Sequence, residues 1–359
     1  MTGTRFRGLD GLRGVAAVTV MLFHCDKYFH IFRHGYLAVD LFMILSGFVI
    51  ALRYEEPLRE GLTIESFLCR RAVRLLPTYW IGALLGIGLF WLSIGLGLNY
   101  TYYSPFMRWI GVPIATIFMI PLIWNKWGAL YPALENVPWS LVAEWAANAL
   151  YAEGLFRLST RSLIVLTLSG WAVMSVVGYH TGAGWCVGMR TTDLMPFGFI
   201  RCIPSFIAGV VIYRVREHSL LRRLPVISTA LLLMGWFGIA AIPATSGTAT
   251  FDMLTVTVAI PALIVLLIRS EETAPAFCSD LGAISYPLYL VQAPIIAIGT
   301  VLPLTGASHG ANPMGCIVAI AASIAAAWGL NRIVLQLSNL AKLVRNNAAS
   351  RGRQARASL

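Results

Sequence analysis

The chain has 359 residues, of which 58% are apolar and only 12% are charged, and its formal net charge is +11. A soluble domain usually carries about twice that charged fraction, because charged side chains cover its surface. Together with a mean hydropathy of +0.73, the composition excludes a disordered protein, a coiled coil and an ordinary cytosolic enzyme. It predicts an integral membrane protein that crosses the bilayer several times. The six cysteines show no CxxC or other metal-type spacing, so neither a zinc site nor a disulfide scaffold is indicated.

Ten segments are long and apolar enough to be membrane helices, each of which needs about 20 mainly apolar residues. They lie at residues 8–29, 35–53, 74–98, 137–156, 162–179, 194–213, 224–243, 250–268, 283–303 and 313–335. The basic N-terminus resembles a signal peptide, but no A-x-A-type cleavage site follows it, and Asp26 and Lys27 come next. The first segment is therefore predicted to be retained, and the fold to be an all-α bundle of about ten transmembrane helices.

The distribution of Lys and Arg predicts the orientation of this bundle. With the N-terminus inside, 21 of the 27 Lys and Arg residues fall at inner helix ends or in inner loops, and six fall outside. Because cytoplasmic loops carry an excess of these residues, both termini are predicted to be cytoplasmic and the protein to lie in the inner membrane. Topology then explains most of the net charge, and no nucleic-acid partner is predicted.

The apolar run 109–124 is the point at which the topology could differ. If this run crossed the bilayer, every later segment would be inverted, and Arg157 and Arg161 would move outside. Prolines interrupt it and aromatic residues surround it, so it is predicted to be an interfacial or re-entrant part of an outer loop. Residues 1–341 are predicted to form the membrane domain, and residues 342–359 a basic, flexible tail drawn to anionic lipid.

Ionisable residues inside the predicted spans are functional candidates, because a charge within a bilayer is costly. Arg13 and His24 lie in the first span, eleven residues apart. This spacing is close to three helical turns, so both project from one face, about 16 Å apart along the axis. The alternative is that Arg13 extends to the inner headgroups and His24 is a hydrogen-bonded structural histidine. The pattern by itself leaves both interpretations open.

Asp40 and Glu144 are predicted to lie at the depth of His24, counted from the outer ends of their spans. In adjacent antiparallel helices, the carboxylate of Asp40 could then orient the imidazole and stabilise its charged form. The alternatives are that Asp40 is a buried helix N-cap and that Glu144 bonds to neighbouring backbone. Neither alternative accounts for the shared depth.

Arg70, Arg71 and Arg74 form a cluster on the predicted inner side. Their spacing lets a helix present two or three guanidinium groups together, which suits a phosphate ligand. An arginine cluster at a membrane boundary is also explained by topology alone. No GxSxG elbow, Walker A loop, HExxH or GxGxxG motif is present, and no metal site is predicted.

Five motifs occur in order along the predicted spans. The first is residues 9–14 (LDGLRG), in which Arg13 is followed after ten further residues by His24. The others are residues 35–42 (GYLAVDLF) with 45–48 (LSGF), residues 70–77 (RRAVRLLP), residues 139–144 (WSLVAE) and residues 285–290 (SYPLYL). Together they resemble the acyltransferase family 3 of integral membrane O-acyltransferases, from about residue 7 to 335. The segment 285–290 is commonly followed in that family by Val or Ile and then His, whereas Gln292 stands at this position here. A second catalytic histidine is therefore not expected there, although Gln can still form hydrogen bonds.

The resemblance implies an enzyme that takes an acyl group, most often acetyl, from cytoplasmic acyl-CoA. It implies an acceptor hydroxyl on a surface glycan or its lipid-linked precursor, met from the outer side. His24 is the catalytic group that the resemblance implies, supported by Asp40 and Glu144, and Arg13 is the implied donor contact. The predicted acyl-CoA site adds Arg70, Arg71, Arg74 and Tyr79, and the predicted lining comprises Ser46, Trp139, Ser140, Tyr286, Tyr289 and Gln292.

Two mechanisms fit these residues. His24 could act as a general base that takes the acceptor proton in a direct transfer, which is the favoured route. It could instead be acylated first and then pass the group on. A thioester donor needs only an acceptor alkoxide and a carbonyl held in attack geometry, so no tightly bound cofactor is predicted.

The alternative function class is a proton-coupled transporter or flippase in which His24, Asp40 and Glu144 form a relay. The paired repeats with broken helices that would support this class are not visible. A structural partner of a synthase complex is a third interpretation, but it leaves the buried charges unexplained.

Overall fold

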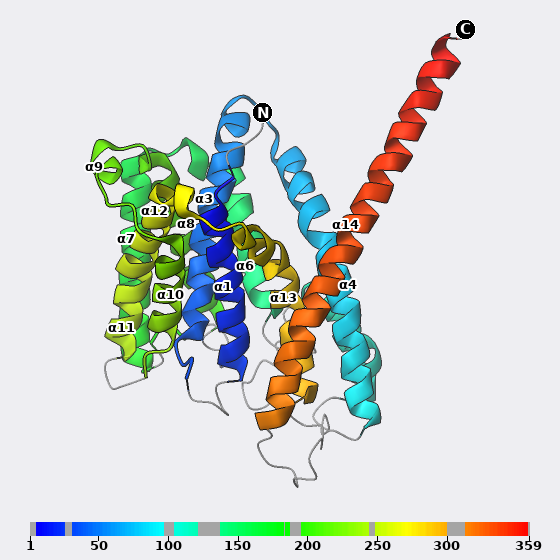
Figure 1. The fold of residues 1–359 in the computed structure, drawn as a ribbon, viewed down its shortest axis with the longest axis horizontal. Coiled ribbons are helices and arrows are strands. Elements are labelled where there is room, and N and C mark those ends of the chain that lie inside the picture. The colour runs from blue at the N-terminus through cyan, green and yellow to red at the C-terminus, as the bar shows by residue number, and fades with distance from the viewer. Residues whose placement is uncertain are drawn as a thin grey trace.

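The structure is a computed structural model, which describes residues 5–25, 31–96, 104–120, 137–182, 184–186, 195–243, 248–299 and 313–357. Within these ranges the chain forms helices and no strands (Figure 1). The helices are α1 (Arg7–His24), η1 (Gly35–Leu37), α3 (Ala38–Arg59), α4 (Ile64–Gly95), η2 (Met107–Gly111), α5 (Val112–Ile117), α6 (Val137–Glu153), η3 (Leu155–Arg157), α7 (Thr160–Thr181), α8 (Met195–Val215), α9 (Ser219–Arg222), α10 (Thr229–Ala240), α11 (Thr248–Leu254), η5 (Thr255–Ala259), α12 (Ile260–Arg269), η6 (Glu271–Thr273), α13 (Phe277–Gly299) and α14 (Pro313–Ala357).

Each of the ten predicted spans overlaps a helix or a run of two or three consecutive helices. In the described part of the chain, seven helical segments are long and apolar enough to cross a membrane. The other three predicted spans correspond to α1, α6 and α10, which have 18, 17 and 12 residues, and α1 carries three charged side chains in its first two turns. The prediction of an all-α membrane protein is confirmed, whereas the exact number of spans and the orientation stay predictions.

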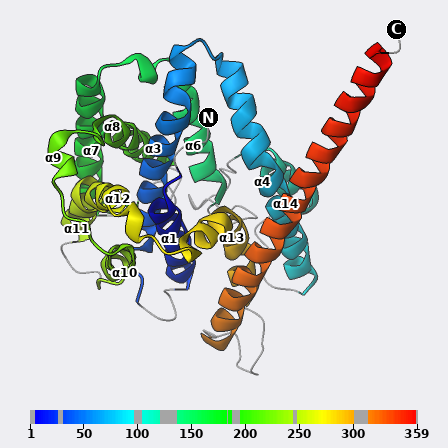
Figure 2. The ribbon, with the colours of Figure 1, turned by 45° about the horizontal axis from the view of Figure 1, so that its top comes forward.

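The bundle has two ends that differ in their side chains. We call the end that contains Arg13, Arg71 and Arg74 the arginine end, and the opposite end, where α1 finishes at His24, the histidine end. Helix α1 begins and α14 finishes toward the arginine end, which is uppermost in Figure 1. Helices α4 and α14 lie on one flank of the bundle, and α7, α8, α10 and α12 lie on the other, with α1 and α3 between them (Figure 2).

Glycines bring α1 and α13 close together. A Cβ atom at Gly11 would lie 2.7 Å from the Cys278 sulfur, and one at Gly14 would lie 2.4 Å from the Leu281 Cβ. These two pairs have the same separation in sequence, so α1 and α13 run in the same direction. Small residues permit this close approach in membrane helices, and it fixes the register of α1 against α13.

A second close crossing joins α3 to α8. Cβ atoms placed at Gly47 and Gly209 would each lie 1.9 Å from a backbone oxygen of the facing helix, that of Phe206 and that of Ile44. The Ser46-Gly47 pair was expected to serve helix packing, and Gly47 has this role. The crossing turns the Gly47 face of α3 toward α8.

The described part of the apolar run 109–124 is helical and short. Helices η2 and α5 together cover Met107–Ile117, which rises about 16 Å, roughly half the thickness of a bilayer core. This helical stretch is therefore too short to cross the bilayer by itself, and residues 121–124 lie outside the described ranges. Helix α5 is held against α4 by a hydrogen bond from the Trp80 indole to the Ile117 carbonyl, 3.3 Å long.

Helix α14 is a single helix of 45 residues that reaches past the rest of the bundle (Figures 1 and 2). It continues without a break through residues 342–357, where the sequence predicted a flexible tail. Near its start, Cys316 forms a disulfide with Cys25, directly after His24. The bond ties the histidine end of α1 to α14.

Candidate active site

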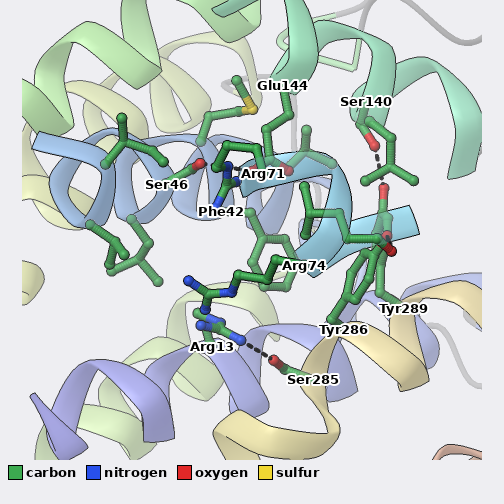
Figure 3. A pocket seen from close by; sticks show the side chains of 17 residues that line it. Arg13, Phe42, Ser46, Arg71, Arg74, Ser140, Glu144, Ser285, Tyr286 and Tyr289 are labelled. Atoms are coloured by element: carbon green, nitrogen blue, oxygen red, sulfur yellow. Dashed lines mark hydrogen bonds and ion pairs between the residues drawn. The ribbon is translucent and has the colours of Figure 1, made fainter. Parts of the chain in front are cut away.

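A cavity of about 140 Å³ lies among α1, α3, α4, α6 and α13 (Figure 3). Its wall is apolar along α3, where lining residues run from Val39 to Ile50. Eleven residues of helix rise about 16 Å, so the cavity is elongated along the bundle axis. Its polar lining residues are Arg13, Ser46, Arg71, Arg74, Ser140, Glu144, Ser285, Tyr286 and Tyr289.

An ion pair lies at one side of the cavity. The Arg71 guanidinium donates a 2.7 Å hydrogen bond to Glu144 Oε1, and the Ser46 hydroxyl donates to the same oxygen at 2.9 Å. Helix α4 starts at Thr63, whose hydroxyl caps it by accepting from the Ser66 amide, and it carries Arg71 about two turns further to this position. The pair joins α3, α4 and α6.

Arg13 and Arg74 add two more guanidinium groups, which lie together in the cavity (Figure 3). Arg13 donates 3.1 Å hydrogen bonds to the Gly282 carbonyl and to the Ser285 hydroxyl, and its guanidinium is 3.9 Å from Asp10. Arg74 forms no hydrogen bond or ion pair with any described residue. Three arginines therefore face one lining carboxylate, and this surplus of positive charge favours an anionic ligand.

The remaining polar groups line the cavity farther from the arginines. The hydroxyls of Ser140 and Tyr289 are 2.6 Å apart, and the Tyr289 ring packs edge-on against Phe42 at 5.7 Å between centroids. The Tyr286 hydroxyl donates to the Leu75 carbonyl at 3.3 Å. The cavity thus combines a cationic part with a largely neutral part, an arrangement that fits a long ligand with an anionic head.

His24 does not line this cavity. It is the last residue of α1, about 16 Å along the axis from Arg13. Its ring lies 5.8 Å from that of Phe23, and its Nδ1 atom is buried without a hydrogen-bond partner among the residues that the structure describes. The imidazole is therefore not held as a hydrogen-bonded structural histidine through this nitrogen.

The structure corrects the expected partnership between Asp40 and His24. One oxygen of the buried Asp40 carboxylate accepts from the Arg201 guanidinium at 2.8 and 2.5 Å, and the other accepts from the Ser205 hydroxyl at 3.1 Å. Asp40 and Gly47 are seven residues apart and so share a face of α3, and that face is turned toward α8. The Asp40 side chain therefore points to α8 and not to α1.

The expected position of Glu144 beside His24 is corrected as well. Glu144 contacts Arg71 and Ser46 and belongs to the cavity at the arginine end. The sequence predicts the depth of Glu144 from its distance to the start of an apolar run. That distance does not tell where α6 begins along the bundle axis. His24, Asp40 and Glu144 do not form a joined relay among the described residues.

The other predicted site residues divide into two groups. Ser46, Ser140, Tyr286 and Tyr289 line the cavity, as do Arg13, Arg71 and Arg74. Arg70 is exposed outside the cavity, and Tyr79 is buried with its hydroxyl donating to the Thr116 carbonyl, so it holds α5 rather than a ligand. Trp139 and Gln292 are buried and do not line the cavity. The Trp139 indole nitrogen and both polar atoms of the Gln292 amide have no hydrogen-bond partner within the described ranges.

A buried network at the histidine end was missed from sequence. The Asp252 carboxylate accepts from the Tyr36 hydroxyl at 2.7 Å and from the Trp185 amide at 3.0 Å, and it lies 3.1 Å from His34 Nδ1. Arg201 links this group to Asp40 by donating to the Tyr36 carbonyl at 2.8 Å. The signal was available, because Arg201 and Asp252 also lie inside predicted apolar spans.

Comparison with known proteins agrees with this architecture. A family model described as an acyltransferase domain matches residues 6–332. The exopolysaccharide production protein ExoZ of Rhizobium meliloti is 28% identical over 279 residues, which cover 75% of this chain and 80% of that protein. The putative membrane-bound transacylase BcsY of Komagataeibacter xylinus is 26% identical over 342 residues, covering 88% of this chain and 79% of that protein.

A third relative, protein 2 in the picA locus of Rhizobium radiobacter, is 34% identical over 180 residues, which are 47% of this chain and 93% of that protein. No solved structure matches the chain. In the described ranges, no group of three His, Cys, Asp or Glu side chains is placed to hold a metal ion. Because the family match spans nearly the whole chain and its helices are apolar enough to cross a membrane repeatedly, the chain belongs to the acyltransferase family 3 and is a multi-pass membrane protein.

Proposed function

We propose that the protein transfers an acyl group, acetyl in the simplest case, from cytoplasmic acyl-CoA to a hydroxyl of an extracytoplasmic or lipid-linked saccharide. The observation that carries this proposal is the elongated cavity in which Arg13, Arg71 and Arg74 face the single carboxylate Glu144. Coenzyme A has several phosphate charges at one end and a long thin arm that ends in the thioester. The charge and shape of the cavity suit such a molecule.

In this proposal the phosphates bind at the arginine end and the arm extends along the apolar side of α3. Guanidinium groups bind phosphate strongly because their planar donors match its oxygens. The lining from Val39 to Ile50 provides about 16 Å of wall. The thioester would thereby be carried toward the histidine end.

The saccharide acceptor is proposed from the relatives. One is named for exopolysaccharide production and another as a putative transacylase, and short matches at 39% identity over 72 residues are named as putative O-acetyltransferases of Staphylococcus aureus. A saccharide hydroxyl outside the cytoplasm would reach His24 from the histidine end. This places the arginine end in the cytoplasm, in agreement with the excess of Lys and Arg there.

The proposed chemistry is a direct transfer. His24 takes the proton of the acceptor hydroxyl as that oxygen attacks the thioester carbonyl. The carbon–sulfur bond then breaks, and the departing thiolate of CoA receives the proton from the imidazolium. The transporter alternative loses its basis, because His24, Asp40 and Glu144 are separated into different groups.

The decisive experiment is CoA release by the purified protein in detergent or nanodiscs. The protein is given acetyl-CoA with a panel of oligosaccharides, and free thiol and acetylated sugar are both measured. The proposal expects both products to form in equal amounts with at least one saccharide class. Absence of acetyl-CoA cleavage with every acceptor, by protein that is folded and monodisperse, would overturn it.

The proposed orientation has a separate test. Arg161→Cys places a thiol in the exposed first turn of α7, in a background where the exposed Cys69 is Ser. A membrane-impermeant maleimide should label this site only after the inner membrane is opened. Ser104→Cys, near the opposite end, serves as the matched control and should be labelled from outside. Labelling of Arg161→Cys in sealed cells would show that the orientation is inverted.

A further inference from the structure

Among the described residues, several buried side-chain polar atoms have no hydrogen-bond partner, and two of the side chains that carry them lie on the neighbouring helices α1 and α13: His24, at Nδ1, and Gln292, at both atoms of its amide. We infer that Gln292 belongs to the active site and that its amide N–H donates a hydrogen bond to the acyl carbonyl oxygen while His24 acts on the acceptor. This inference rests on the proposed function and assigns a further residue to it.

The packing of α1 against α13 places these residues at one level. Gly14 meets Leu281 and Gly11 meets Cys278, and the helices run in parallel. Extending that register by ten residues from Gly14 brings His24 level with Val291, next to Gln292. The two side chains therefore lie at the same height in adjacent helices.

The faces agree as well as the heights. Arg13 and Ser285 are joined by a 3.1 Å hydrogen bond across the same helix pair. On α1, His24 follows Arg13 by eleven residues, and on α13, Gln292 follows Ser285 by seven. At about 100° per residue, His24 therefore projects within about 20° of the direction of Arg13, and Gln292 within about 20° of the direction of Ser285. The faces that meet at Arg13 and Ser285 thus meet again at His24 and Gln292.

The cavity leads to this place. Its lining on α13 ends at Tyr289, one turn before Gln292, and its lining on α3 ends at Val39. Shortly before that, Gly35 packs against Phe23, since a Cβ there would lie 2.5 Å from the Phe23 Cβ. A ligand that enters at the arginines and follows the cavity wall would end within about one turn of both side chains.

The state of the Gln292 amide explains why a ligand is expected there. The residue is fully buried, and within the described part of the chain neither its nitrogen nor its oxygen has a hydrogen-bond partner. A buried polar group left unpaired destabilises the fold, so an apolar side chain of the same shape would give a more stable bundle. A retained amide is accounted for when a bound substrate supplies the missing partner.

The chemistry at this point needs such a donor. Attack of the acceptor oxygen converts the thioester carbonyl to a tetrahedral oxyanion before the carbon–sulfur bond breaks. A fixed donor aimed at that oxygen is worth most in a site without water, and loss of one such donor typically lowers turnover by about 10²- to 10³-fold. The Gln292 N–H can supply this bond without exchanging a proton.

The test compares Gln292→Met, which keeps the volume and removes the amide, with the unmodified protein. We expect turnover in acetyl transfer to fall by about 10²-fold or more, with little change in KM for acetyl-CoA and no fall in the thermal unfolding midpoint. Gln292→Asn retains the donor but withdraws it by one methylene and should also lose turnover. Ile296→Met, a buried change one turn further along α13, is the control and should keep turnover.

The outcomes separate this inference from the proposed function. Normal turnover in Gln292→Met would overturn the role of the amide while leaving the acyltransferase proposal in place. A lower unfolding midpoint with turnover unchanged in Gln292→Met and Gln292→Asn would show a purely structural residue and would also overturn it. Lack of any acetyl-CoA-dependent transfer by the unmodified protein would instead overturn the proposed function.

Discussion

The bundle places charged side chains in two regions that differ in exposure and pairing: the first is partly open, with Arg74 exposed, and the second is fully buried. At the arginine end, Arg13, Arg71 and Arg74 face Glu144 around a cavity, and positive charge remains uncompensated. At the histidine end, Asp40, Arg201, Asp252 and His34 are fully enclosed, and each has partners.

A buried charge is costly unless it is paired, so the second region has the character of a structural clamp. The first keeps unpaired charge beside empty space, as a ligand site does. His24 belongs to neither region: it lies at the end of α1, and its Nδ1 is buried without a partner among the described residues.

The largest expected effect is at His24. We expect His24→Ala to lower acyl transfer by about 10²- to 10⁴-fold, because the acceptor proton then has no base. Binding of acetyl-CoA, measured by calorimetry, should persist, because the arginines are unchanged. In the unmodified protein the rate should fall on the acid side, where a protonated imidazole cannot accept a proton.

The matched control is His180→Ala, which changes an exposed histidine at the end of α7 and should leave transfer unchanged. Near-normal transfer by His24→Ala would remove the general base from the mechanism. His24 would then have a structural role only.

The second prediction concerns the clamp. Asp40→Asn should lower the free energy of unfolding by about 3–5 kcal/mol, because the buried Arg201 guanidinium loses its counter-charge. Replacing both partners, as Asp40→Leu with Arg201→Met, should recover much of that loss. Thermal unfolding in detergent and the yield of folded protein are the measurements.

An exposed pair provides the comparison for this experiment. Glu217 and Arg222 form an ion pair with both side chains more than 60% exposed, so Glu217→Gln should change the free energy of unfolding by only about 0–1 kcal/mol. If Asp40→Asn proved as stable as Glu217→Gln but lost transfer selectively, Asp40 would have a direct role near His24 after all.

The third prediction separates ligand binding from topology at the arginine end. Arg74→Gln should raise KM for acetyl-CoA by about tenfold or more while affecting turnover less, because a charged hydrogen bond to phosphate is worth about 1.5–3 kcal/mol. Arg70→Gln changes an exposed residue of the same helix that does not line the cavity, and it should have little effect. Equal effects of the two substitutions would mean that the cluster only marks the cytoplasmic side.

The smallest expected effect is at Glu144. Glu144→Gln keeps a hydrogen-bonding group next to Ser46 but frees Arg71 from its counter-charge. A phosphate some 7 Å away would gain about 1 kcal/mol, so KM for acetyl-CoA should fall by about fivefold with turnover nearly constant. If turnover instead dropped by about a hundredfold, the loss expected when a general acid or base is removed, Glu144 would take part in the proton transfer.

Much of the architecture was predictable because it depends on local properties of the chain. The ten apolar segments coincide with helices, since apolar length and composition act within one segment. The five motifs identified the family, and the arginine spacing correctly predicted that Arg71 and Arg74 share a helical face. Gly47 was likewise expected at a close helix contact, because only small residues allow it.

Only the tertiary structure decided which helix each polar face meets. Sequence spacing gives the depth of Asp40 and its face on α3, but the crossing at Gly47 and Gly209 turns that face to α8 and Arg201. The position of Glu144 along the bundle axis likewise depends on how α6 packs against α4, and the burial of Tyr79 depends on how α5 packs against α4. Helix periodicity is a property of one helix, whereas a contact requires the position and direction of two, and these follow from packing across the whole bundle.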